Sequence, residues 1–350
     1  MKIGMMGGWN TNSGSSFHAE LIGKEWIESG HKLEIFTFYD YAFHGTAITA
    51  IDEPYVTRCF TVSSYIPPKL DPIPFLTSEC EVFVTQDLGM LPKNELGKIF
   101  KRIKKRSKCV TVIHDGNLSK NPDFYQFGWD SVVCFDKRYK EFLEPVYGDK
   151  TRIIPYPCLP WNPGNKGNAR RKLDLPMDKK IVFSFGPAAK HIIDIIPDIA
   201  ELGKKYPLLL LIVSKEKDIV NFLKSCLPVI PMPVKIIEEI PDTNKLYDYL
   251  YAADALIFNK PSASQVVVSS TAFQCLGSGC PMITRNSNFA EYFDKEVMKF
   301  SDTDELKHQL ISVFEEKEEY RKTLESAKLY VTENSYKEIG RKFIELFKSL

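Results

Sequence analysis

Short apolar runs alternate with amphipathic stretches along most of the chain. Lys2–Met6 and Lys32–Phe38 are apolar runs of strand length, and Phe17–Ser29 between them places Leu21 and Trp26 on one helix face. A strand, a loop of small residues, a helix and a second strand form a βαβ unit. The loop lacks the GxGxxG spacing of dinucleotide-binding proteins. The pattern therefore predicts a Rossmann-like unit without indicating a nicotinamide cofactor.

The same alternation of predicted strands and helices continues through the first half of the chain. It predicts further strands at Cys80–Gln86, Cys109–Ile113, Ser131–Phe135 and Thr151–Ile154, and helices at Lys93–Arg106 and Arg138–Val146. Residues 40–78 interrupt the rhythm, because they are irregular and rich in proline and aromatic residues. Such a long segment either shapes an acceptor pocket or forms surface loops around short strands.

A second rhythm follows the segment Pro155–Asn168, which is dense in Pro, Gly and Asn and indicates a domain boundary. The strands predicted after it are Lys180–Gly186, Leu208–Val213, Val234–Ile237, Ala255–Phe258 and Pro281–Thr284. We predict an α/β protein with a domain at residues 1–160, a second at 161–333 and a C-terminal helix at 334–350. The apolar side chains Phe343, Leu346 and Phe347 give this helix a face with which to pack back on the first domain.

Composition narrows the functional classes. The chain has 350 residues, 44% of them hydrophobic, and a formal net charge of +1, which does not favour a nucleic-acid partner. Its eight cysteines form no CxxC pair, so we expect neither a metal site nor disulfides. The opening Met1–Gly8 is too short and glycine-broken for a signal peptide, and we expect a cytoplasmic protein. The basic stretch Lys98–Lys108, around Lys101, is either a solvated helix face or a weak contact with the inner membrane face.

Polar side chains follow several predicted strands of the first half. Asp87 comes directly after one strand, and His114 and Asp115 come after the next. Ligands of open parallel sheets bind outside the carboxyl ends of the strands. We therefore expect these side chains to meet the loop Gly7–Gly14 at one edge of the sheet, although a histidine at a strand end can also be purely structural.

A strand, a polar loop and a helix starting with hydroxyl side chains make up the stretch Ala255–Thr284. The hydroxyl groups belong to Ser269, Ser270 and Thr271. A helix N-terminus offers free N–H donors to an anion, so this stretch is either a diphosphate site or an ordinary capped helix. Gly186 and Lys190 follow an earlier strand, where Lys190 either contacts a phosphate or points into solvent.

Four stretches, in this order and spacing, resemble the GT-B glycosyltransferases of the large family four. They are Gly14–Leu21 with Glu28–Leu33, then Val110–Asp115, then Ile153–Pro157, and finally Tyr251–Ala255 through Pro261–Ser262 to Gly279–Pro281. The resemblance covers nearly the whole chain. It implies two Rossmann-like domains facing across a deep cleft.

The resemblance also implies a function. It implies transfer of a sugar from a nucleoside-diphosphate donor, held mainly by the second domain, to a hydroxyl acceptor on the first. The acceptor would be a glycan, a lipid-linked saccharide or a small molecule, with retention of configuration and without a cofactor or metal. His114 would contact the donor sugar or handle the acceptor proton, with Asp87 and Asp115 on the acceptor side. The leaving group would be stabilised by Gly14, Ser15, Gly186, Lys190 and Ser269–Thr271.

The chain departs from the family at its donor motif. The two glutamates of the family, separated by seven residues, fall at Val266 and Gln274. Gln265 remains to bond a sugar hydroxyl and Gln274 a ribose hydroxyl, while the family's arginine is Pro187, which leaves Lys190 as the nearby cation. The resemblance thus implies a variant donor site. A sugar-nucleotide epimerase, a phosphorylase-like enzyme and an inactive binding partner of the same fold are the alternatives.

Overall fold

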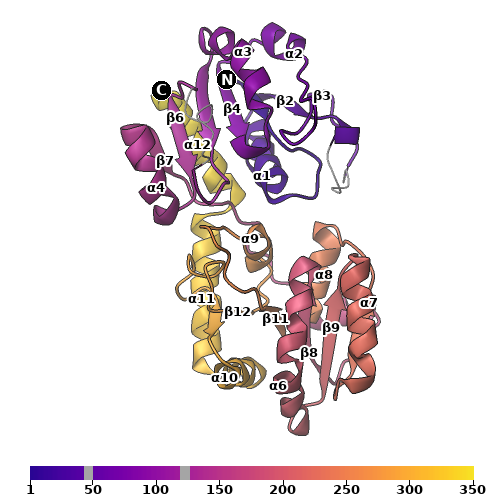
Figure 1. Ribbon diagram of the computed structural model, residues 1–350. Helices are drawn as coiled ribbons and strands as arrows, with labels where there is room; N and C mark the ends of the chain where they lie inside the picture. Colours follow the sequence, from indigo (N-terminus) through magenta and orange to yellow (C-terminus); the bar gives the residue numbers. More distant parts are fainter. Residues whose placement is uncertain (43–49, 119–126) are drawn as a thin grey trace. The chain divides into compact units, whose positions relative to one another are not determined.

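The computed structural model describes residues 1–42, 50–118 and 127–350 (Figure 1). It contains two compact units. The first unit comprises Met1–Pro157, Ser264–Ser270 and Asn334–Leu350, and the second comprises Cys158–Ala263 and Thr271–Glu333. The segment Ser264–Ser270 thus packs with the first unit, although the ranges expected from the sequence place it in the second domain.

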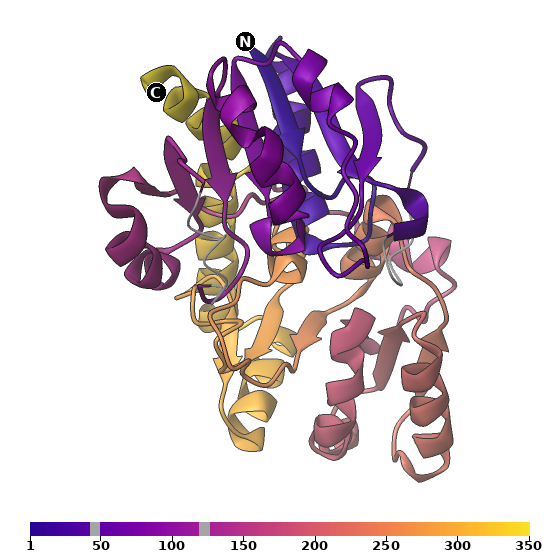
Figure 2. The same cartoon turned by 45° about the horizontal axis from the view of Figure 1, so that its top comes forward.

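Within the described ranges, the first unit is built on a parallel sheet of seven strands in the order β3-β2-β1-β4-β5-β6-β7 (Figure 2). The strands are β1 Lys2–Met6, β2 Lys32–Phe38, β3 Val56–Phe60, β4 Val82–Gln86, β5 Lys108–Val112, β6 Ser131–Cys134 and β7 Thr151–Ile153. The helices are α1 Gly14–Glu28, α2 Ile73–Thr77, α3 Lys93–Lys104, α4 Lys137–Tyr147 and α12 Tyr336–Ser349, with 3-10 turns η1 Asp40–Ala42, η2 Leu88–Met90 and η4 Gly148–Lys150. The strand order reverses between β1 and β4, so the carboxyl ends of these two strands form the topological switch point.

Residues 40–78 contain more regular structure than their composition suggested. The edge strand β3 pairs in parallel with β2, and α2 follows it. Residues 43–49 of this segment lie outside the described residues. The described part of the segment therefore contains a short edge strand and a short helix joined by loops.

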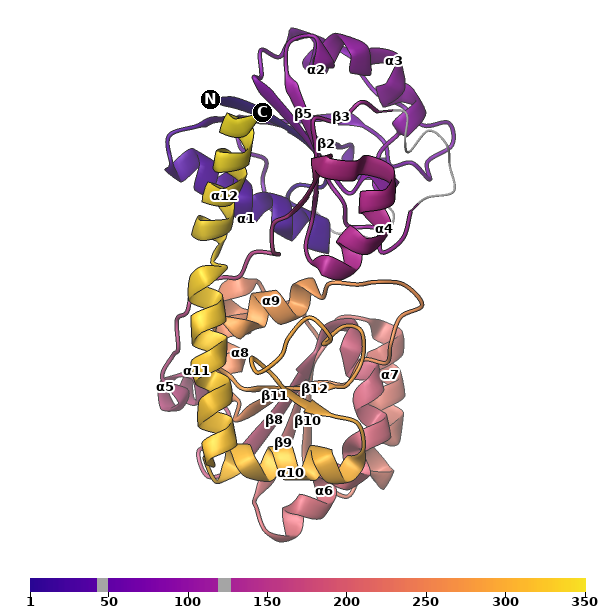
Figure 3. The ribbon, with the colours of Figure 1, turned by 90° about the vertical axis from the view of Figure 1, so that its left-hand side faces the viewer.

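The C-terminal helix α12 packs on α1, as its apolar face predicted (Figure 3). The indole Nε1 of Trp26 donates a hydrogen bond to the Gly340 carbonyl at 3.2 Å. The rings of Phe343 and Phe347 contact Trp26 at centroid distances of 5.9 and 5.4 Å. A side chain at Gly340 would lie 2.5 Å from Glu25 Cγ, so the glycine allows this close approach.

In the described part of the second unit, a parallel sheet of six strands has the order β10-β9-β8-β11-β12-β13. The strands are β8 Lys180–Phe185, β9 Leu208–Val213, β10 Val234–Ile237, β11 Ala255–Phe258, β12 Met282–Arg285 and β13 Met298–Phe300. The helices are α5 Lys166–Lys172, α6 Ile196–Glu201, α7 Lys217–Cys226, α8 Thr243–Ala252, α9 Ser270–Leu276, α10 Thr303–Phe314 and α11 Glu318–Glu333, with 3-10 segments η5 Gly186–Ile195, η6 Leu202–Lys204 and η7 Leu227–Val229. Every residue of β9 and β11 is buried, as expected of central strands covered on both faces.

A buried ion pair holds the amino ends of this second sheet. Arg170 and Asp254 lie 2.7 Å apart with only 5% and 6% of their side chains exposed. Asp254 also accepts the backbone N–H of Ile181 at 2.7 Å and pairs with Lys166 at 2.8 Å. These bonds compensate the cost of removing the charges from water, and they tie α5 to the starts of β8 and β11.

Candidate active site

A cavity of about 230 Å³ lies at the switch point of the first unit, and all its walls come from that unit. Six of the residues predicted from the sequence line it: Gly14, Ser15, Asp87, His114, Gln265 and Ser270. Aromatic and apolar side chains supply much of the remaining wall: Met90, Phe135, Tyr139, Tyr156 and Val266–Val268. A concave, largely apolar site with a few polar groups is typical of small-ligand pockets.

One wall of the cavity is formed by the segment Ser264–Ser270, which side-chain hydrogen bonds hold within the first unit. Arg138 Nη2 donates to the Val267 carbonyl at 3.2 Å, and Asn117 Nδ2 donates to Gln265 Oε1 at 3.1 Å. A Cβ atom at Gly116 would lie 1.8 Å from the Val266 carbonyl oxygen. Only glycine permits this approach, so Gly116 allows the segment to close the cavity.

The glycine loop and the start of α1 form a second wall. The side chain of Ser13 caps α1 by accepting the Ser16 N–H at 3.2 Å. The Tyr156 hydroxyl donates to the Gly14 carbonyl at 2.7 Å, and a Cβ atom at Gly14 would lie 3.0 Å from Ser270 Oγ. The amino end of a 15-residue helix therefore borders the cavity, and its N–H groups favour an anion.

His114 is neutral and has a defined tautomer. Its Nε2 lies 2.9 Å from Gln86 Oε1, while the Gln86 amide nitrogen contacts Met5 Sδ at 3.8 Å. Since a carbonyl oxygen only accepts, Nε2 carries the proton and Nδ1 is a hydrogen-bond acceptor. Burial lowers the pKa of His114 to about 3. At neutral pH the ring therefore accepts hydrogen bonds from a ligand without taking its proton.

Asp87 contributes to the cavity a carboxyl whose pKa is shifted. Burial raises its pKa to about 7, the negative charge of Asp115 contributes to this rise, and the positive charge of Lys93 opposes it. Its backbone is left-handed, with φ of 54°. Burial also raises the pKa of Asp115, against the opposing effects of Lys93 and the Gly89 backbone. A carboxyl that titrates near pH 7 is suited to proton transfer.

Several predicted residues lie elsewhere. Asp115 and Ser269 belong to the first unit but do not line the cavity. The others belong to the second unit: Gly186, Lys190, Thr271 and Gln274. Gly186 begins η5 with φ of 64°, Lys190 is exposed, and the Gln274 carbonyl accepts the Tyr247 hydroxyl at 3.1 Å.

Two buried residues beside the cavity were not predicted as site residues. Gln86 orients His114 through the bond described above, and His18 lies edge-on to His114 at a ring distance of 5.2 Å. Burial and the neighbouring His114 lower the pKa of His18. The signal for His18 was present, since it lies in the Gly14–Leu21 stretch on which the family resemblance rests.

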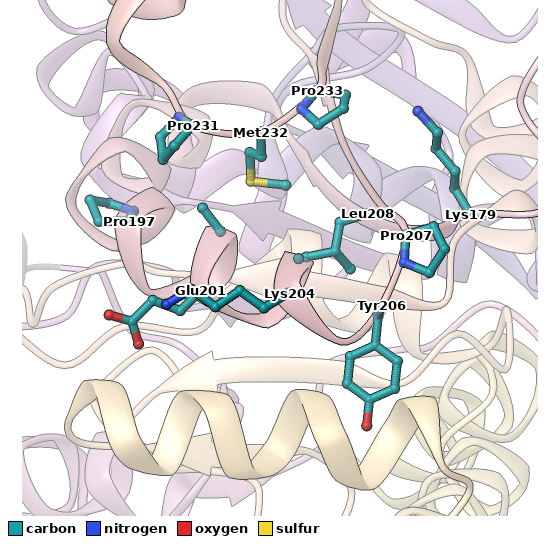
Figure 4. Close-up of a pocket in the computed structure, with 12 residues that line it drawn as sticks. Lys179, Pro197, Glu201, Lys204, Tyr206, Pro207, Leu208, Pro231, Met232 and Pro233 are labelled. Carbon is teal, nitrogen blue, oxygen red and sulfur yellow. The ribbon is translucent and has the colours of Figure 1, made fainter.

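The second unit has a larger cavity, of about 530 Å³, at the amino ends of β8, β9 and β10 (Figure 4). Its walls include four prolines: Pro197, Pro207, Pro231 and Pro233. Ligands of parallel sheets bind at the opposite, carboxyl edge. We therefore place the candidate active site in the cavity of the first unit.

Comparisons with known proteins agree with this architecture. No family model matches the chain. A glycosyltransferase from Rickettsia africae is 15% identical, with a TM-score of 0.72 over 99% of this chain and 98% of that chain. HepE of Anabaena, in complex with UDP-glucose, is 15% identical with a TM-score of 0.70 over 100% of both chains. Sucrose-phosphate synthase from Thermosynechococcus elongatus is 13% identical, with a TM-score of 0.68 over 99% of this chain and 98% of that one. These likenesses confirm the predicted GT-B fold of two Rossmann-like domains.

Proposed function

We propose that the protein is a glycosyltransferase that moves a sugar from a nucleoside-diphosphate donor to a hydroxyl acceptor. The observation that carries this proposal is the switch-point cavity, in which Asp87 titrates near neutral pH beside a neutral His114. The fold supports it, because whole-length structural neighbours are glycosyltransferases and one of them holds UDP-glucose.

The side chains of the cavity suit the bond changes of this reaction. The bond between the anomeric carbon and the diphosphate oxygen breaks, and its electron pair leaves with the diphosphate. The acceptor oxygen forms the new bond to that carbon and loses its proton. We assign the proton to Asp87, whose pKa of about 7 leaves much of the carboxyl ionised at neutral pH. Nδ1 of His114 would accept a hydrogen bond from a sugar hydroxyl. The side-chain amide of Gln265 would donate one to another sugar hydroxyl.

Backbone and hydroxyl groups would stabilise the departing diphosphate. We assign this role to Gly14 and Ser15 at the start of α1, and to the Ser270 hydroxyl, which lines the same cavity. By resemblance to the family we propose retention of configuration and charge neutralisation by the protein's own groups, so that no resident metal is needed.

We also propose a weak contact of α3 with an anionic membrane surface. Part of its charge is used inside the protein, because Lys104 lies 2.9 Å from Asp130. Lys101 and Arg102 of α3 and Lys105, its C-cap residue, are among the basic residues of this stretch that stay exposed. In the described ranges no helix is long and apolar enough to cross a bilayer. Replacing all three by Ala should weaken binding to phosphatidylserine vesicles by roughly a hundredfold, at about 1 kcal/mol each. Equal binding of wild type and the triple variant in vesicle sedimentation would refute this contact.

The donor site is tested by thermal shift against a panel of nucleoside-diphosphate sugars. A donor at 100-fold its dissociation constant should stabilise the protein by about 2.7 kcal/mol. His114→Ala should weaken binding of the sugar nucleotide but not of the free nucleoside diphosphate, because His114 is assigned to the sugar. If no donor shifts the transition, the proposed function is wrong. If a donor binds but is converted in the absence of any acceptor, an epimerase becomes the better assignment.

A further inference from the structure

The side chains that line the switch-point cavity carry negative charge but no positive charge. Among the described residues of its walls, Asp87 supplies a carboxyl and none is a lysine or an arginine. Asp115 does not line the cavity, but its negative charge acts on Asp87. The rest of the lining consists of hydroxyl, amide, aromatic and aliphatic groups together with His114. The charge state of His114 therefore decides whether the described walls offer a cation to a ligand.

The surroundings of His114 keep its ring uncharged. Nε2 donates to Gln86 Oε1 at 2.9 Å, and the Gln86 side chain is fully buried. Because an amide is uncharged, this partner fixes the ring without favouring the imidazolium, as a carboxylate in its place would. The second ring beside it, that of His18, lies 5.2 Å away and is also buried. His114 thus presents an acceptor nitrogen to the cavity, which suits a hydroxyl group and repels a carboxylate.

Two cations near the cavity have their charges balanced by carboxylates. Arg138 Nη2 lies 2.7 Å from an oxygen of Asp136, whose side chain is only 6% exposed. The ammonium of Lys93 acts on two carboxyls, those of Asp87 and Asp115. The amino end of α1 also favours an anion, and it is assigned to the diphosphate. A negative group on the sugar itself would therefore enter this cavity without a cation to balance it.

We infer that the cavity selects a donor whose transferred sugar is uncharged, and that Asp87 helps to exclude the corresponding uronic acid. The inference rests on the proposed function, which places the sugar beside His114 and Gln265. The volume of about 230 Å³ suits one sugar ring, since pockets for drug-sized ligands hold about 300–1,000 Å³.

The physical basis of this selection is the cost of moving a carboxylate out of water. A hydroxymethyl group exchanges its hydrogen bonds with water for bonds with the cavity walls. A carboxylate at the same carbon loses more favourable hydration and gains no opposite charge in return. It would also lie in the field of the Asp87 carboxyl, and like charges brought together disfavour the wrong ligand.

Calorimetric titration of the whole protein with matched pairs of sugar nucleotides tests this inference. The pairs are UDP-glucose with UDP-glucuronic acid, UDP-galactose with UDP-galacturonic acid, and GDP-mannose with GDP-mannuronic acid. The two members of a pair differ only at C6 of the sugar, where a carboxylate replaces a hydroxymethyl group. At pH 8, above the pKa of about 7 of Asp87, the neutral member should bind at least about tenfold more tightly. Asp87→Asn should reduce this ratio, whereas Asp149→Asn, at an exposed position of the same unit, should not change it.

The outcomes separate this inference from the proposed function. Wild-type protein that binds a uronic acid donor as tightly as its neutral partner would overturn the inference and keep a sugar nucleotide as the ligand. If no member of any pair binds, the proposed function and the inference fail together. A preference for neutral sugars that Asp87→Asn leaves unchanged would overturn the part assigned to Asp87. The comparison of the pairs with wild-type protein needs no substitution, so it does not depend on the folding of a variant.

Discussion

Replacing Asp87 by Asn should stabilise the protein while abolishing most of its activity. Asn has the same shape as Asp and tolerates the left-handed backbone that this residue adopts, with φ of 54°. The substitution therefore removes a charge from a half-buried, poorly solvated position with little change in packing. The ionised carboxyl is unfavourable there, because burial and Asp115 raise its pKa. Loss of a general base typically costs a factor of about 10²–10⁴ in rate.

The size of the stabilisation follows from the shift in pKa. The Asp87 carboxyl moves from 3.8 to about 7, which corresponds to about 4 kcal/mol when the group is fully ionised. Because the folded-state pKa is raised, the penalty is absent below pH 4, grows as the pH rises and is complete above pH 7. We expect Asp87→Asn to stabilise by about 2 kcal/mol at pH 5 and by up to about 4 kcal/mol at pH 8. The upper value is a limit, since part of the side chain reaches the cavity.

Tryptophan fluorescence during thermal unfolding at pH 5 and pH 8 measures the change in stability of the first unit, which contains Asp87. Three of the four tryptophans, Trp9, Trp26 and Trp129, are buried in the first unit. Asp149→Asn is the control, because that carboxyl is exposed in the same unit. A variant at Asp87 that is less stable than wild type at pH 8, or whose gain is equal at both pH values, would refute the reasoning.

Two further substitutions test the close packing at Gly116 in the first unit and the buried ion pair of Asp254 in the second unit. Gly116→Ala should displace Ser264–Ser270, because the new methyl group would lie 1.8 Å from the Val266 carbonyl oxygen. Titration with the sugar nucleotide should then show weaker binding. Gly97→Ala is the control and should leave binding unchanged, because no atom lies within 4 Å of the added methyl group. Asp254→Ala should destabilise the second unit by about 3–5 kcal/mol, because it leaves the buried Arg170 unpaired. Urea denaturation checks this value, and a loss below about 1 kcal/mol would contradict it.

Local patterns predicted much of the fold. Strand-length apolar runs and amphipathic helices are encoded by neighbouring residues, so most strands of both sheets were predicted near their observed positions. The edge strands β3 and β13 were not predicted. The sequence of β3, Val56–Phe60, includes the polar residues Thr57 and Arg58 and lies among prolines. Its pairing with β2 depends on a contact between distant segments rather than on its own pattern.

The residues of the candidate site that directly follow a strand could be predicted from the sequence. Asp87 and His114 come together in the cavity because they follow the neighbouring parallel strands β4 and β5. Strand order, by contrast, cannot be read from one local pattern. Lys190 was therefore taken as the only cation of its region, whereas the order β8-β11-β12 brings Lys260 and Arg285 to the same edge. The packing of Ser264–Ser270 with the first unit likewise depends on long-range bonds such as that from Arg138.

The central claim is tested most directly by following both products of one reaction. The protein is incubated with the sugar nucleotide that gives the largest thermal shift and with pooled saccharide and lipid-linked acceptors. Mass spectrometry measures the acceptors while released nucleoside diphosphate is quantified. We predict acceptor molecules heavier by one sugar residue, released nucleoside diphosphate in equal amount, and loss of both products with Asp87→Asn. Release of nucleoside diphosphate without any glycosylated acceptor, or undiminished transfer by Asp87→Asn, would contradict the account.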